Sequence, residues 1–99
     1  MILSLKEWRA RSAAGAAAAA ALKARLAGRL GLAPGDAVSV QEVACPDPGC
    51  PDRETIVLVM RAGERTRAIR LRATPETVDD AEIEAFVAEE RRRREAGEA

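Results

Sequence analysis

Apolar positions follow two different spacings, and the change between them divides the chain into three parts. Leu22, Leu26 and Leu30 recur every four residues, which is the spacing of one helix face. Short apolar runs and alternating positions replace that spacing in the middle of the chain, as is typical of strands. The helical spacing then returns. We therefore predict a single α+β domain over residues 1–99, with an N-terminal helical region (1–35), a sheet (36–73) and a C-terminal helix with a frayed tail (74–99).

The first helix is predicted to begin at a capping box and to be longer than a small sheet. Ser4 and Glu7 have the Ser-x-x-Glu spacing, in which each side chain accepts a hydrogen bond from an orphan backbone amide. Gly31 ends the helix, about 40 Å further along at 1.5 Å per residue. Either the helix breaks between Ser12 and Gly15, which the glycine slightly favours, or its first half overhangs the sheet and packs on a partner.

Three strands are predicted between the helices. Valines at 38, 40 and 43 mark the first strand, which ends at a pair of cysteines. Residues 55–60 (Thr-Ile-Val-Leu-Val-Met) are apolar on both faces, which predicts a central strand covered on both sides. A short turn at 62–64 leads into a returning strand whose two faces alternate: Arg67, Ile69 and Leu71 on one, Thr66, Ala68, Arg70 and Arg72 on the other.

The second helix carries signals at both ends. Thr74-Pro75-Glu76 predicts a turn, and Asp79 with Glu82 repeats the capping spacing before an apolar stripe. The four arginines at 91–94 suit the C-terminal end of the helix dipole. The predicted order is therefore α-β-β-β-α, a three-stranded antiparallel sheet packed with an alanine-rich N-terminal helix and a C-terminal helix.

Composition indicates a thin core. Trp8 and Phe86 are the only aromatic residues of the 99, so leucine, isoleucine and valine must fill the interior. Small cores of this kind gain stability from a partner, a metal or a crosslink. We therefore expect a protein partner or a homodimer.

The formal net charge is zero, but charges alternate in blocks. Residues 1–33 carry +5, 34–60 carry −4, 61–73 carry +4, 74–90 carry −7 and 91–99 carry +2. Blocks of this kind indicate that basic and acidic elements face one another within the fold or across a dimer.

The basic hairpin is a candidate anion-binding site. Five arginines crowd it and could bind phosphate groups: Arg61, Arg65, Arg67, Arg70 and Arg72. Stacking aromatic residues are missing from the predicted sheet, which argues against a nucleic-acid reader. The acidic start of the second helix offers internal partners instead, namely Asp79, Asp80, Glu82 and Glu84. A salt-bridged surface is the favoured interpretation.

Several function classes are disfavoured by the sequence. No segment approaches the roughly 20 apolar residues of a membrane span, and the charges at Lys6, Glu7, Arg9 and Arg11 do not fit a secretory signal. We therefore expect a cytoplasmic protein without membrane association. Histidine is absent, so the commonest general base is lacking, and no phosphate loop or nucleophile triad is present. Catalysis is disfavoured.

The most distinctive chemistry lies in the segment Cys45-Pro46-Asp47-Pro48-Gly49-Cys50-Pro51. Proline followed by glycine suits the central positions of a type II turn, so the loop should fold back and hold the two thiols close together. Three uses are open: thiol redox chemistry, a zinc or iron–sulfur site at Cys45 and Cys50, or a rigid recognition loop. Two cysteines supply only half of a tetrahedral zinc site. The recognition loop would comprise Pro46, Asp47, Pro48, Gly49 and Pro51.

One short resemblance bears on this segment. Cys45-Pro46-Asp47-Pro48 resembles the Cys-Pro-x-Pro motif of small sulfur-carrier proteins of the TusA type, whose cysteine carries a persulfide. The match covers four residues. In that family the motif opens an amphipathic helix, whereas here Gly49 and Pro51 interrupt and a β-rich run follows. The resemblance makes Cys45 the better candidate of the two for sulfur chemistry.

Taken together, these patterns predict a small accessory or adaptor protein that binds a protein partner or itself. The first expectation is that it carries no cofactor. The alternative is a thiol redox or metal/iron–sulfur-handling protein that uses the Cys45–Cys50 loop.

Overall fold

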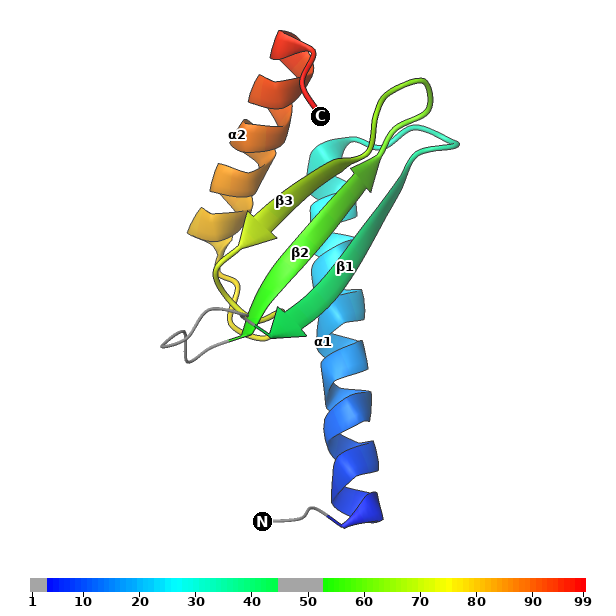
Figure 1. The fold of residues 1–99 in the computed structure, drawn as a ribbon, viewed down its shortest axis with the longest axis vertical. Helices are drawn as coiled ribbons and strands as arrows, with labels where there is room; N and C mark the ends of the chain where they lie inside the picture. The colour runs from blue at the N-terminus through cyan, green and yellow to red at the C-terminus, as the bar shows by residue number, and fades with distance from the viewer. Residues whose placement is uncertain (1–3, 45–52) are drawn as a thin grey trace.

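The computed structural model of this chain describes residues 4–44 and 53–99. Its elements are α1 (Leu5–Leu30), β1 (Ala37–Ala44), β2 (Arg53–Met60), β3 (Arg67–Leu71) and α2 (Asp80–Ala96). Figure 1 shows the three strands as one layer, with α1 passing behind it and α2 beside β3. The α+β class and the α-β-β-β-α order predicted from the sequence are confirmed.

The sheet is an antiparallel meander in the order β1-β2-β3. Val57 of β2 pairs with Val40 on one side and with Ile69 on the other, so these three side chains lie in one row on the same face. The pairing makes β2 the central strand, as its apolar sequence predicts. The returning strand alternates between buried and exposed residues, as predicted.

Both helices pack on the same face of the sheet. The core consists of residues from all five elements and the turn before α2: Leu22, Leu26, Leu30, Val38, Val57, Val59, Ile69, Leu71, Val78, Ile83, Phe86 and Val87. The strand residues in this set belong to a single side of the pleat, because they are mutual neighbours in the register. The core is therefore one layer deep, between one sheet face and two helices.

The first helix runs without interruption through Gly15, so the break that the sequence slightly favoured is wrong. The glycine lowers helix stability by only about 1 kcal/mol relative to alanine, and strong helix formers surround it. Ser4 and Glu7 form the predicted capping box, and Gly31 ends the helix with a left-handed φ of 62°. At 1.5 Å per residue α1 is about 39 Å long, whereas an eight-residue strand is about 27 Å. Its first half therefore extends past the sheet (Figure 1).

The second helix ends in a glycine cap instead of the frayed tail expected from the sequence. Asp79 and Glu82 form the predicted capping box at its start. At its end Gly97 has a φ of 72°, and its N–H donates to the carbonyl of Arg94 at 3.1 Å. The N–H of Glu98 donates to the carbonyl of Arg93 at 2.7 Å. These two bonds satisfy carbonyls that would otherwise have no partner.

The described helices cover one side of residues 55–60, whereas the sequence predicted cover on both sides. No described helix or strand lies over the second face of β2, and its residues Ile56, Leu58 and Met60 are only partly buried. In the same described part of the chain, neither helix is long and apolar enough to cross a membrane.

Two glycines of α1 provide a test of this helix. A Cβ added at Gly28 meets no atom within 4 Å, so we expect Gly28→Ala to raise the free energy of unfolding by about 1 kcal/mol. Gly31→Ala places a side chain at a left-handed φ and should lower it by about 1 kcal/mol. Urea unfolding of both variants measures the difference. Equal effects of the same sign would contradict the assigned end of the helix.

Candidate functional site

The sheet face that points away from the helices carries large apolar side chains. On β2, Val57 and Val59 point toward the helices and are 0% exposed. The alternate residues Ile56, Leu58 and Met60 project to the opposite face, where they are partly buried and no described helix or strand lies over them. An antiparallel sheet with one solvated face normally carries polar residues there. This face departs from that rule along its central strand.

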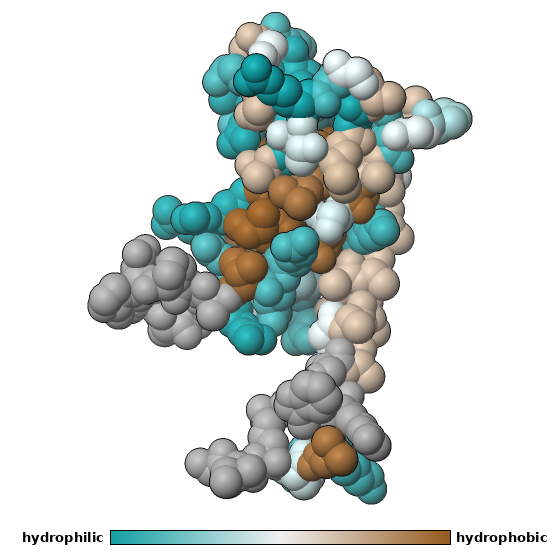
Figure 2. Space-filling view, turned by 45° about the vertical axis from the view of Figure 1, so that its right-hand side comes forward, coloured by the Kyte–Doolittle hydropathy of each residue, from teal (hydrophilic) through white to brown (hydrophobic). Residues whose placement is uncertain are grey.

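The centre of this face is free of charge. Leu58 pairs with Ser39 on β1 and with Ala68 on β3, and Met60 pairs with Ala37. Charges begin beside Ile56, which pairs with Gln41 and with Arg70. Arg70 Nε in turn lies 3.3 Å from Glu54 Oε1. Figure 2 shows brown, hydrophobic residues gathered over the sheet with teal residues around them. The face therefore has an apolar centre and a polar rim, the composition of a protein interface.

The free edge of β3 is a poorer place for a partner. Arg93 Nη1 reaches across from α2 and donates to the carbonyl of Ala68 at 3.0 Å. A charged side chain that covers an edge carbonyl reduces pairing with another strand. Of these two surfaces, the open face is therefore the better place for a partner.

The overhanging half of α1 is a second uncovered surface. Among the side chains of α1 that the structure describes, Leu22 is the first along the helix that is nearly fully buried, at 1% exposure. Ala13, Ala14, Ala16 and Ala17 are exposed. The chain carries no charged residue from Ser12 to Leu22, which is about three turns of helix. A helix that is uncharged all round is usually buried.

A buried ion cluster lies near the end of β2. This end of the sheet is opposite the overhang of α1 (Figure 1). Arg61, at the end of β2, and Glu90, in α2, are 8% and 2% exposed. Arg61 Nη2 donates to Glu90 Oε1 at 2.7 Å and to the carbonyl of Leu30 at 2.8 Å. The same guanidinium lies 3.7 Å from Asp36 Oδ2 through Nη1. One side chain thus joins the end of α1, the turn before β1, β2 and α2.

Arg67 completes this cluster from the start of β3. Its Nη2 lies 2.7 Å from Glu64 Oε1, and its Nε donates to the carbonyl of Glu98 at 3.0 Å. Its Nη1 is 3.6 Å from Glu90 Oε2, and neither atom has a hydrogen-bond partner among the described residues. This last contact is Coulombic only. Glu90 is therefore a carboxylate shared by two buried guanidinium groups, those of Arg61 and Arg67.

Backbone amides hold Asp36 in its charged form. Its side chain accepts from the N–H groups of Ala62 and Ala33, both at 2.9 Å. These two bonds, more than the nearby Arg61, lower the pKa of the Asp36 carboxyl. Glu64 has a lowered pKa because Arg94 and Arg67 donate to it. The turn and the hairpin are thus linked through carboxylates that remain ionised.

The sequence suggested that the acidic start of α2 pairs with the hairpin arginines, but the structure places its carboxylates elsewhere. Asp80 lies 2.6 Å from Arg25, and Glu84 pairs with Arg29, so these two carboxylates bind α1. Asp79 and Glu82 form the helix cap instead. The prediction failed because the tertiary structure places α1, and not the hairpin, beside the first turns of α2.

The predicted site residues divide into two groups. Cys45, Cys50 and the loop residues Pro46, Asp47, Pro48, Gly49 and Pro51 lie outside the described residues. The five hairpin arginines do not form one patch, because Arg61 and Arg67 are buried in the ion cluster whereas Arg65 and Arg72 are exposed. Arg70 pairs with Glu54. Anion binding by these residues stays a prediction.

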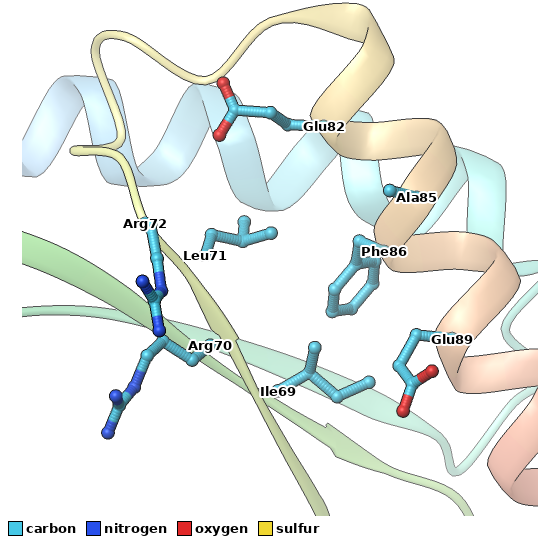
Figure 3. Close-up of a pocket in the computed structure, with 8 residues that line it drawn as sticks. All are labelled: Ile69, Arg70, Leu71, Arg72, Glu82, Ala85, Phe86 and Glu89. Carbon is cyan, nitrogen blue, oxygen red and sulfur yellow. The ribbon is translucent and has the colours of Figure 1, made fainter.

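Hollows on the described surface are shallow or charged. Figure 3 shows one between β3 and α2, where Phe86 and Ile69 face each other and Arg70 and Arg72 extend away from the helix. Its volume of about 200 Å³ is below the roughly 300–1,000 Å³ of ligand pockets. A larger one of about 470 Å³ is lined by four charged residues, Glu64, Arg91, Arg94 and Glu95. Over residues 4–44 and 53–99, no three potential metal ligands are grouped.

Comparison of the chain with protein-family models, with curated proteins and with solved structures finds no match. The open sheet face is therefore interpreted from its own residues. The sequence analysis missed this site because it interpreted the apolar run 55–60 as covered on both sides by the chain itself. The signal was present: Ile56, Leu58 and Met60 occupy the positions that a half-solvated strand would fill with polar residues.

The ion cluster predicts that removing the charge of Glu90 strongly lowers the free energy of unfolding. Glu90→Gln leaves two buried guanidinium groups without their shared carboxylate, and breaking a buried pair costs about 3–5 kcal/mol. We expect a fall of about 3 kcal/mol in the free energy of unfolding, measured by urea titration. Glu95→Gln, at an exposed position of the same helix, should change it by less than about 0.5 kcal/mol. Similar values for both variants would contradict the role of the cluster.

The lowered pKa of Asp36 predicts that part of the stability of the fold is lost in acid. Its pKa is lower in the folded chain than in the unfolded chain, so its contribution is present above about pH 3.9 and is lost as the pH falls through the folded value. Asp36→Asn should be less stable than the parent at neutral pH, and the difference should shrink in acid. Thermal melts across this range measure it. A difference that stays constant with pH would contradict this assignment.

Proposed function

We propose that this protein is a small accessory or adaptor protein that binds a protein partner, or a second copy of itself, through the open face of its sheet. One observation carries the proposal: the apolar side chains of Ile56, Leu58 and Met60 on a face that no described element covers. These side chains are partly buried in the single chain and form a contiguous apolar patch with a polar rim, which is typical of an interaction site.

The energetics support this proposal. Full burial of a leucine, isoleucine or methionine side chain contributes about 1.5–3 kcal/mol. Each of the three residues is already partly covered by its neighbours, so a partner would gain a part of this value at each of them. Single apolar residues are common on surfaces, but three in a row on a central strand give one continuous contact area.

The chemistry of the face favours a protein as the ligand. Its centre is uncharged, with Leu58 beside Ser39 and Ala68, so it offers no cations for a nucleic acid. Protein interfaces of moderate size have this composition. The apolar face of a helix or of another sheet would match it.

Replacement of apolar residues on the face tests the proposal. Leu58→Lys with Met60→Lys places two charges in its centre, where burial by a partner would require their desolvation. We expect the double variant to fold and to lose the proteins, including further copies of the chain, that the immobilised parent captures from an extract of the host cell. Quantitative mass spectrometry of the captured proteins measures the loss.

The matched control is Ala88→Lys, which makes the same kind of change at an exposed position of α2. It should retain the captured proteins. Replacing both cysteines by serine, Cys45→Ser with Cys50→Ser, distinguishes the alternative of thiol or metal chemistry: the adaptor role predicts unchanged capture, whereas thiol chemistry predicts a loss of function in a folded protein. Equal capture by the parent and the double lysine variant would refute the proposal.

A further inference from the structure

We infer that the open sheet face is occupied by the overhanging half of α1 from a second copy of this chain, in a two-fold dimer in which each copy covers the other. This inference rests on the proposed function and names the occupant of the same face. It is argued from four properties of the described residues: position, periodicity, length and size.

The overhang of α1 and the open face lie on opposite sides of the sheet. In Figure 1, α1 passes behind the strands and continues beyond the end of the sheet where β2 begins. Consider a two-fold axis that lies in the plane of the sheet, near that end, and runs across the strands. Rotation about this axis brings the helix side of one copy to the open-face side of the other. It sets the second sheet end to end with the first and lays each overhang across the front of the other sheet. One rotation therefore covers both open surfaces of both copies.

The periodicity of α1 supports the same arrangement. Leu22 and Leu26 pack on the chain's own sheet, and the spacing of four continues backward through Ala18 to Ala14. One face of the helix thus carries large residues where it meets its own sheet and small residues where it overhangs. Under the two-fold rotation, the overhanging part of this face points at the partner's Ile56, Leu58 and Met60. Small helix residues allow close approach to large residues on a sheet.

The lengths and charges of the two surfaces match. The overhang from Leu5 to Ala17 is about 20 Å long, and the strands that it would cross are about 27 Å long. The uncharged stretch from Ser12 to Leu22 would lie over the uncharged centre of the face. The reciprocal contact would bury Ala13, Ala14 and Ala17, which the single chain leaves exposed.

The number of residues favours reciprocal helix exchange over simple stacking of two sheets. The open face has about ten outward residues in the paired strands, well short of the roughly 20–30 residues per side in a standard interface. One side of the overhang adds about half of its thirteen residues. Reciprocal exchange uses both surfaces of each copy, so it buries more residues than stacking of the two sheets alone.

Sedimentation velocity over a range of concentrations provides the first test. We expect the parent to form a dimer, and both Ala14→Glu and Leu58→Lys to raise its dissociation constant about tenfold or more. Ala16→Glu is the matched control, since residue 16 is exposed and lies on the opposite side of the helix from residue 14. It should leave the dissociation constant unchanged. Circular dichroism checks that every variant keeps its helix content.

Crosslinking gives the second test. In a background with Cys45→Ser and Cys50→Ser, a chain with Ala14→Cys is mixed with a chain with Ser39→Cys and treated with a short bismaleimide. We expect crosslinked heterodimers, because the overhang of one copy lies over the face of the other. Ala88→Cys in place of Ala14→Cys should give none.

The outcomes separate this inference from the proposed function. A parent that stays monomeric overturns the dimer, but the proposed function still stands if the double lysine variant loses a different protein. A dimer that Leu58→Lys does not weaken places the interface elsewhere and overturns the inference. Crosslinks between two Ser39→Cys chains, without helix-to-sheet crosslinks, would show stacked sheets and overturn the exchange of helices.

Discussion

The two-sided apolar character of β2 is the constraint on which the rest of this structure depends. Val57 and Val59 supply one face with fully buried side chains, and all the core residues of both helices collect on that face. A sheet of three strands has two faces, and the two helices in the described part of the chain cover only one of them. The core on the helix side of the sheet is therefore fully packed, whereas apolar side chains on the other side are not covered by a described element. This difference is the physical basis of the proposed interaction.

The buried ion cluster fixes how the elements meet at the other end of the sheet. Arg61 reaches the last carbonyl of α1 and the carboxylate of Glu90 in α2, so it sets the position of both helices relative to the hairpin. Buried ion pairs contribute little net stability compared with apolar residues of the same volume, but removing one partner is costly. This cluster therefore specifies an arrangement more than it adds to stability. The apolar core beside it supplies the larger favourable contribution.

Charge blocks in the sequence correspond to contacts between elements. The basic second half of α1 faces the acidic start of α2 through Arg25 with Asp80 and through Arg29 with Glu84. The basic end of α2 faces the hairpin through Arg94 and Glu64, at 3.2 Å. These exposed pairs contribute little each, but like charges at the same positions would repel. Opposite blocks thus favour one pairing of the helices over others.

The sequence by itself determined the local structure. Capping residues, glycines with left-handed φ and the two apolar spacings depend on neighbours within a few positions, so both helices, the hairpin and the central place of β2 could be predicted. Tertiary structure alone decided three features: that α1 continues through Gly15, that Asp80 and Glu84 pair with α1, and that Ile56, Leu58 and Met60 remain open. Each depends on which elements lie side by side, and residue spacing along one chain does not contain that information.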